Sequence, residues 1–309
     1  MRGVVRTVGL AVLVVVVALV AGTAARSTVT TVAAPATAAT ATAPPTAGAS
    51  PRPTPPVTQK TTPSSTLSID MMSMTLKNKL YTAGKVPAVS CKVPGSAPKS
   101  KTALLAYARV MVDCMYRAWA PVVARADVYF DRPVVVAYKA GAKSASAACD
   151  DGPTDTDAYY EPSARTICFE WGEFVGSGDA TWDLVDFQTM LAHEFGHHLQ
   201  TSVGILTTYW TGHAQASKAV RLEDERRLEL QASCFGAAFL GANRRPFRLT
   251  GWRLEMWEDQ VTHTGDEYAP DKVRDHGSRK NHGYWSLRAF DSTNPSSCNT
   301  FVAPAKRVS

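Results

Sequence analysis

The segment that most constrains the fold of this chain is "LAHEFGHHLQ", residues 191–200. It places His193, Glu194 and His197 in the order H-E-x-x-H. Residues four apart in an α-helix lie nearly one above the other, so the two imidazoles point to one place. Glu194, about 100° further round the helix, borders the same cleft. If this segment is helical, it therefore presents three polar groups on one side.

The other side of the same helix is apolar. The predicted helix runs from about Ala180 to Val203, and its apolar residues recur at helical spacing away from the histidines. These residues are Leu184, Phe187, Leu191, Phe195 and Leu199. Such a helix packs its apolar side into a core and leaves its histidine side to line a cavity.

Two histidines at this spacing, with a glutamate beside the first, are typical of a helical zinc site. A catalytic zinc ion takes three protein ligands and a water molecule. The longer pattern H-E-x-x-H-x-x-G-x-x-H, which would supply a third histidine, is broken by Gln200 and Val203. We therefore expect the third ligand to come from elsewhere in the chain.

A second predicted helix, from about Lys218 to Leu240, offers three candidates for that ligand: Glu223, Glu225 and Glu229. Glu229 lies 32 residues after the second histidine of the motif (229 − 197) and is followed by small and apolar residues, which indicates an inward position. Glu223 and Glu225 lie among arginines, which is typical of a solvated face. We favour Glu229, and His213 is the alternative.

The two segments "AHEFGHHLQ" and "RRLELQASCFGAAF" resemble the bacterial family described as "putative neutral zinc metallopeptidase", with its motifs H-E-[FY]-G-H-H-x-Q and E-L-Q-A-D-C-F-A-G. The resemblance extends over about 71–309 and includes the tail, where the family carries His-Gly-[ST] and a final Cys-[ND]-Thr-Phe. It implies a gluzincin-like fold with His193, His197 and Glu229 on zinc and Glu194 as the catalytic glutamate.

The chain departs from the family pattern at Ser233, where E-L-Q-A-D has aspartate. In related gluzincins that carboxylate supports a histidine that binds zinc. A serine accepts a hydrogen bond but supplies no charge, and changes around the ligands typically cost about 10–100-fold in metal affinity or activity.

The expected chemistry is peptide hydrolysis. Zinc lowers the pKa of its bound water and polarises the scissile carbonyl, while Glu194 takes the water's proton and delivers it to the leaving amine. The family's tail motif implies His276 as the stabiliser of the oxyanion, and the alternative is an ordinary surface histidine. The segment "RTICFEW" (165–171) is interpreted as a strand with an open edge for an extended peptide. The alternative is an internal strand pinned by Cys168.

The remaining patterns predict a mostly helical α+β fold with a small β-sheet. The resemblance implies that this domain is a zincin-like metallopeptidase. Helical spacing at 100–119, with Ser100 as a cap, and at 251–263 predicts two further helices. Strand formers gather at 127–131, 133–138 and 165–171, with a loop at 150–157. From Gly265 onward the tail is expected to be mostly irregular.

The N-terminus indicates export. Residues 1–25 combine Arg2 and Arg6 with an uncharged run of nineteen residues (26 − 6 − 1), which fits a signal peptide or an uncleaved signal anchor. Residues 26–68 are rich in Thr, Ala and Pro and predict a disordered linker. The domain at 69–309 is therefore expected to be secreted or anchored to the outer face of the cell membrane. Contact with the membrane is expected only through the N-terminal segment, if it is uncleaved.

Six cysteines without a C-x-x-C pair, in an exported chain, favour disulfides over metal thiolates. Order and proximity in the sequence favour the pairs Cys91–Cys114, Cys149–Cys168 and Cys234–Cys298. The alternative for Cys234 is a role as a catalytic nucleophile.

The formal charge of +6 is spread along the chain without a basic run that aromatic residues interrupt, so nucleic acid is not an expected partner. The favoured function is that of an extracytoplasmic zinc-dependent peptidase acting on a peptide or protein substrate. The alternative is a membrane-tethered or secreted binding or scaffold protein with a structural or vestigial zinc site.

Overall fold

The computed structural model describes residues 73–309, apart from 143, 145, 151–156, 214–215 and 269–272. The predicted signal or anchor at 1–25 and the linker at 26–68 lie outside the described residues, as does most of the loop predicted at 150–157. No helix within the described ranges is both long enough and apolar enough to cross a bilayer.

The described residues form a mostly helical α+β fold with a three-stranded sheet, which confirms the predicted fold class. The helices are α2 (Lys101–Arg125), α3 (Ala180–Ser202), α4 (Ile205–Gly212), α5 (Lys218–Ala242), α6 (Trp252–His263) and α7 (Arg279–Ser292). The strands are β1 (Val134–Tyr138), β2 (Ala158–Glu161) and β3 (Thr166–Glu170). Short 3-10 helices lie at Lys79–Thr82, Ala147–Cys149, Asp266–Tyr268, Pro295–Cys298, Thr300–Val302 and Ala305–Arg307.

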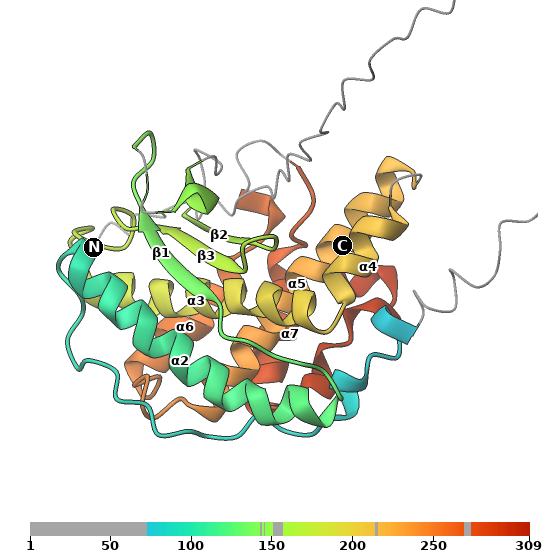
Figure 1. Cartoon of the computed structure of the whole chain (residues 1–309), viewed down its shortest axis with the longest axis horizontal. Helices are drawn as coiled ribbons and strands as arrows, with labels where there is room; N and C mark the ends of the chain where they lie inside the picture. Colours follow the sequence, from blue (N-terminus) through green and yellow to red (C-terminus); the bar gives the residue numbers. More distant parts are fainter. Residues whose placement is uncertain (1–72, 143, 145, 151–156, 214–215, 269–272) are drawn as a thin grey trace, which may run out of the picture. The chain divides into compact units, whose positions relative to one another are not determined.

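Helix α3 runs through the middle of the domain, with the sheet above it and α6 and α7 below it in the view of Figure 1, while α5 crosses it. The side chain of Asp179 caps its first turn by accepting from the backbone N–H groups of Thr181 and Trp182, each at 3.0 Å. The five apolar residues predicted for its back face are all buried, with at most 4% exposure. The predicted orientation of this helix is confirmed.

The strand order is β1-β3-β2, with β3 parallel to β1 and antiparallel to β2. The interpretation of 165–171 as an open edge is therefore wrong. Strand β3 is central because it pairs with β1 along one edge and with β2 along the other, and all five of its residues are buried. The strand formers at 127–131 also do not form a strand, because α2 continues to Arg125 and Asp127 turns the chain with a φ of 59°.

The two faces of the sheet have different neighbours. One face, which includes Ile167 and Phe169 of β3, belongs to the main core beside α3. The opposite face carries a small separate cluster: Val136, Tyr138, Cys149, Tyr159 and Cys168. This division follows from the alternation of side chains along a strand.

Disulfides join the cysteines in the three predicted pairs, Cys91–Cys114, Cys149–Cys168 and Cys234–Cys298. Their Cα–Cα separations are 5.8, 5.7 and 5.6 Å, within the usual range for a disulfide. Because Cys234 is bonded to Cys298, it has no thiolate with which to act as a nucleophile.

Helix α7 contradicts the prediction of an irregular tail. Its buried residues are mostly small or polar: Asn281, His282, Gly283, Trp285, Ser286, Ala289 and Phe290. A helix whose buried face contains so few large apolar residues has no clear hydrophobic periodicity, so the pattern that marks α3 is missing here. The helix forms because its small residues let it pack closely against α5 and α6.

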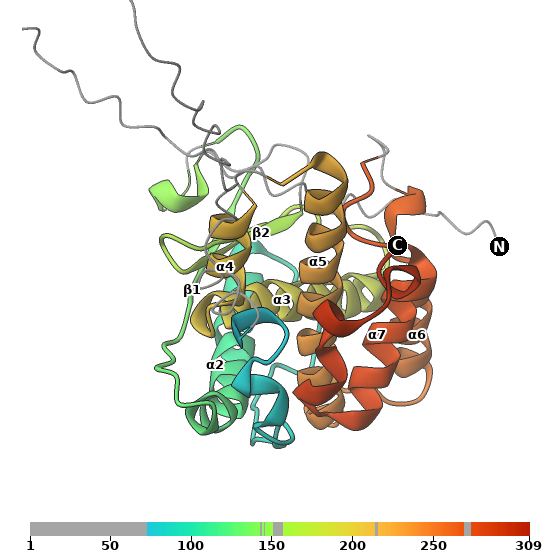
Figure 2. The ribbon, with the colours of Figure 1, turned by 90° about the vertical axis from the view of Figure 1, so that its right-hand side faces the viewer.

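Two glycines permit the close crossing of α3 and α5, which Figure 2 shows from the side. A Cβ atom on Gly196 of α3 would lie 2.4 Å from the carbonyl oxygen of Ala232. A Cβ atom on Gly236 of α5 would lie 2.8 Å from backbone atoms of Ala192. Only glycine allows backbones to approach so closely. The two helices can therefore bring short polar side chains together.

Substitution of Gly196 by alanine is expected to destabilise the domain, because the new methyl group meets the α5 backbone rather than a side chain that can move. We expect Gly196→Ala to lower the free energy of unfolding by about 1–3 kcal/mol in urea denaturation. Ser202→Ala, in the last turn of the same helix, is the control and should change it by less than about 0.5 kcal/mol. Equal stability of Gly196→Ala and wild type would contradict the proposed role of the crossing.

His198 is a structural histidine on the α3 side away from the metal-binding motif. Its Nε2–H donates to the carbonyl of Asp131 at 2.9 Å, and its Nδ1 lies 3.0 Å from the hydroxyl of Tyr160, which donates to it. The ring is fully buried and packs against Phe130 and Phe195. Burial lowers the pKa of His198 to about 4, so the folded protein holds it neutral.

This buried neutral ring predicts acid sensitivity. Below pH 6.5 the unfolded chain binds a proton at His198 that the folded chain refuses until about pH 4. Its contribution to stability is thus lost as the pH falls through that window, at up to about 1.4 kcal/mol per pH unit. Urea denaturation between pH 7 and 5 should show a shallower pH dependence for His198→Gln than for wild type. His263→Gln, at an exposed histidine of α6, should keep the wild-type slope, and identical slopes for all three proteins would contradict this prediction.

Candidate metal site

The two motif histidines lie one turn apart on α3 and face the same point. Their Nε2 atoms are 3.1 Å apart, and their exposed fractions are 9% for His193 and 4% for His197. Glu229 reaches the same point from α5: its Oε2 lies 3.2 Å from Nε2 of His193 and 3.3 Å from Nε2 of His197. The crossing of α3 and α5 thus assembles the three predicted ligands.

The spacing of these three atoms suits a zinc ion. Tetrahedral zinc with bonds of about 2.0–2.2 Å needs ligand atoms roughly 3.3–3.6 Å apart. The observed separations of 3.1–3.3 Å are close to that requirement before any adjustment. Two imidazoles and one carboxylate are also a donor set that catalytic zinc takes. The residues present therefore fit the metal.

The other candidate ligands lie elsewhere. Glu223 forms an ion pair with Arg227 at 2.6 Å, and Glu225 is not among the residues that line the cleft. Glu225 is nevertheless half-buried rather than solvated, and burial and the Asp275 carboxylate raise its pKa to about 7. His213 lies 2.6 Å from the carbonyl of Tyr209 and 2.5 Å from Asp224.

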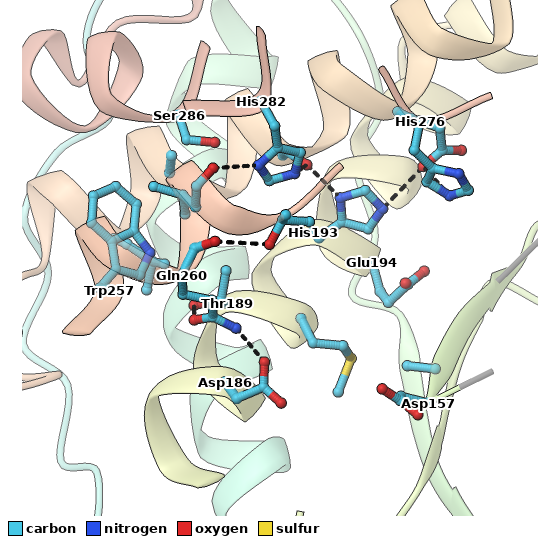
Figure 3. A pocket seen from close by; sticks show the side chains of 18 of the residues that line it. Asp157, Asp186, Thr189, His193, Glu194, Trp257, Gln260, His276, His282 and Ser286 are labelled. Atoms are coloured by element: carbon cyan, nitrogen blue, oxygen red, sulfur yellow. Dashed lines mark hydrogen bonds and ion pairs between the residues drawn. The ribbon is translucent and has the colours of Figure 1, made fainter. Parts of the chain in front are cut away.

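Glu194 lines the same cleft beside His193 (Figure 3). Only 6% of the residue is exposed, and this burial raises the pKa of its carboxyl group, while His193 and His197 oppose the shift. Its carboxylate is not one of the three clustered ligand atoms. A carboxyl group in this position, next to the ligands but separate from them, is suited to accept and return a proton.

His276 also lies at the site, so the alternative of an ordinary surface histidine is wrong: it is 8% exposed. Its Nδ1 donates to the Asp275 carboxylate at 2.6 Å, and its Nε2 lies 3.6 Å from Oε2 of Glu229. Burial disfavours the charged ring, but Glu229 and then Asp275 outweigh it and raise the pKa of His276 to about 9. The ring is thereby held with a donor directed into the cleft.

The far side of each ligand ring is hydrogen-bonded. Nδ1 of His197 lies 2.9 Å from Oε1 of Gln200, whose amide group donates to Gln231 at 3.1 Å. Nδ1 of His193 lies 2.8 Å from Oγ of Ser233. Such contacts fix the orientation of a metal ligand. Gln200 was not predicted from the sequence as the partner of His197, although its position three residues later on the same helix face indicates such a contact.

A cleft surrounds these residues, bounded by α3, α5, α6, α7 and β2. Its apolar walls include Phe174, Met190, Leu240 and Trp257, while Ala158 and Tyr159 of β2 line its edge. Strand β2 pairs with β3 on one side, and no described strand covers its other side. Strand β2, rather than β3, is therefore the strand that borders the cleft.

Comparison with known proteins gives a family for the chain. Residues 64–251 match the family described as "Putative neutral zinc metallopeptidase", which is 188 of 309 residues (251 − 64 + 1). The chain belongs to this family. The matched region contains both motif histidines, Glu194 and Glu229, and it ends before His276.

Two curated relatives are similar to the chain, both called "Uncharacterized protein YpfJ", from Escherichia coli strain K12 and Escherichia coli O6:H1 strain CFT073. Each is 26% identical over 183 residues, which cover 56% of this chain and 62% of the relative. The match therefore spans less than two thirds of the relatives' length. No solved structure matches the chain.

The ligand assignment is tested by zinc affinity, measured on the full-length protein by competition with a chromogenic chelator. Glu229→Ala should weaken binding by more than the roughly 10–100-fold typical of a lost contact around a ligand. Glu223→Ala, on the same helix but paired with Arg227, should bind like wild type. If Glu229→Ala keeps its metal and His213→Ala loses it, the assignment of the third ligand is wrong.

Proposed function

We propose that this protein is a zinc-dependent peptidase that works outside the cytoplasm. The observation that carries the proposal is the position of Glu194, whose carboxyl group lines the cleft beside the three ligands without joining them. A structural zinc site has no need for a buried carboxyl group next to its ligands, whereas hydrolysis needs a proton acceptor there. The family to which the chain belongs supports zinc as the metal.

His193, His197 and Glu229 hold the metal, which supplies Lewis acidity to the cleft when bound. Glu194 takes a proton from the attacking water and then delivers it to the nitrogen of the leaving amine, so the carboxylate is regenerated in each cycle. His276 donates from Nε2 to the oxygen of the scissile carbonyl as negative charge develops on it. Asp275 keeps the ring of His276 oriented for that donation through the bond to Nδ1.

The lining of the cleft favours a peptide with an apolar side chain as substrate. Ala158 and Tyr159 of β2 line the cleft that holds the three ligands, so a bound peptide would lie beside this strand. The apolar walls of the cavity suit a substrate side chain. Peptides or protein segments with an apolar side chain are therefore the proposed substrates.

Two features support a location outside the cytoplasm. Three disulfides lie in the described domain, and such bonds persist in oxidising compartments. The basic and then apolar sequence at 1–25 has the character of an export signal or a signal anchor. We therefore propose that the protein is secreted or held at the outer face of the membrane by its N-terminal segment.

Substitution of Glu194 separates catalysis from metal binding. Glu194→Gln keeps the size of the side chain but removes the proton acceptor, so turnover should fall by about 10²–10⁴-fold while zinc stays bound. Cleavage of a complex peptide pool, read by mass spectrometry, and zinc content measure the two effects. Glu223→Gln makes the same chemical change away from the cleft and should leave both unchanged.

The opposite result has a clear meaning. If wild type and Glu194→Gln hold zinc equally and neither differs from the other on any peptide, the catalytic proposal fails. A tethered or secreted binding protein with a vestigial zinc site would then describe the chain better.

A further inference from the structure

Ser233 connects a metal ligand to a second buried histidine. Its Oγ lies 2.8 Å from Nδ1 of His193 on one side and 3.0 Å from Nε2 of His282 on the other. Nδ1 of His282 in turn lies 3.1 Å from the carbonyl oxygen of Val261. The contacts form one continuous chain from α3 through α5 and α7 to α6.

The direction of every hydrogen bond in this series follows from its last acceptor, the carbonyl oxygen of Val261. A carbonyl oxygen only accepts, so the ring of His282 carries its proton on Nδ1 and donates to Val261. Val261 lies in the last turn of α6, where carbonyl groups have no N–H partner four residues on within the helix. The ring of His282 therefore donates from Nδ1 to a carbonyl group that has no hydrogen-bond partner within its own helix.

The remaining bonds then have only one arrangement for a neutral ring. With its proton on Nδ1, His282 has a bare Nε2 that accepts the hydroxyl hydrogen of Ser233. The oxygen of Ser233 is thus left to accept from Nδ1–H of His193. That places the proton of His193 away from the metal and leaves the lone pair of its Nε2 facing Glu229 and the ligand site.

Burial and packing hold the chain of bonds in place. Ser233 and His282 are 8% and 4% exposed, so water does not compete freely for their polar atoms. Burial lowers the pKa of His282 to about 4, in agreement with a neutral ring. Beside it, a Cβ on Gly283 would lie 2.9 Å from Cγ2 of Thr262, so glycine lets α7 approach the end of α6.

We propose that His282 is a positioning residue for the zinc site, which acts through Ser233 to keep the proton of His193 on Nδ1. Ser233 alone is an ambiguous partner, because a hydroxyl can donate to Nδ1 as readily as it accepts from it. Donation to Nδ1 would favour the other tautomer, whose Nε2–H competes with the metal. His282 removes that ambiguity because its Nε2 accepts the hydrogen bond of the Ser233 hydroxyl group. The neutral pair of Ser233 and His282 thus orients the ring of His193 as a carboxylate would.

The inference rests on the zinc site of the proposed function but not on peptidase activity. The first test measures the zinc dissociation constant of the full-length protein by chelator competition. His282→Leu fills the space without an acceptor and should weaken zinc binding by about 10–100-fold. His282→Gln restores an acceptor near the position of Nε2 and a donor for Val261, so its affinity should stay within a few-fold of wild type. His263→Leu makes the leucine change at an exposed histidine and should have no effect.

A double-mutant comparison shows whether Ser233 and His282 act as one unit. Ser233→Ala should weaken zinc binding about as much as His282→Leu, and the variant with both changes should be no weaker than either single one. Additive losses of zinc affinity would mean that the two residues act separately, and would overturn the proposal that His282 acts through Ser233.

A spectroscopic measurement tests the direction of the bonds without any substitution. Nitrogen-15 NMR of the histidine rings near pH 7 should show neutral His282 with its proton on Nδ1. A proton on Nε2 would make His282 a donor to Ser233 and would overturn the proposal.

The outcomes also separate this inference from the proposed function. If wild type binds zinc and His282→Leu binds it equally well, the relay is wrong while the peptidase proposal stands. If wild type does not bind zinc, the proposed function fails first, and the relay fails with it.

Discussion

The close crossing of α3 and α5 is the constraint on which the rest of the site depends. Gly196 and Gly236 remove the two Cβ atoms that would otherwise hold the backbones apart. Helix axes ordinarily lie about 8–10 Å apart, with the distance set by the side chains at the contact, and here both contact positions are glycine. At this crossing Glu229 contacts both motif histidines, with its Oε2 3.2 and 3.3 Å from their Nε2 atoms. The packing of two glycines therefore decides the geometry of three ligands.

Because the ligand rings are buried, the hydrogen-bond partners around them affect the stability of the site. In a low-dielectric interior an unpaired polar group is costly, so each ligand ring has a partner on its far side. His197 is supported through Gln200 and Gln231, and Gln231 also donates to the hydroxyl of Tyr81 at 2.8 Å. The disulfide of Cys234, next to Ser233, joins α5 to the C-terminal tail. Segments that are distant in the sequence thus fix the positions of α3 and α5, which carry the ligands.

The parts of the fold that could be predicted are those with strong local patterns. Helix α3 was predictable because its apolar residues repeat at helical spacing and Asp179 caps its start. Helix α7 was not, because its buried face contains His282, Gly283 and Ser286 in place of large apolar residues. Strand β2 was also missed: it is four residues long, and its pairing with β3 depends on a contact that no local pattern encodes.

The sequence by itself determined the pair of imidazoles and the glutamate beside them, because the spacing of His193 and His197 places both rings on one helix face whatever the rest of the chain does. It also favoured Glu229, from the apolar residues that follow it. Only the tertiary structure decided that His276 and His282 meet these residues and that β2, rather than β3, borders the cleft. The physical reason is that helical periodicity is local, whereas these contacts depend on how closely separate elements approach one another.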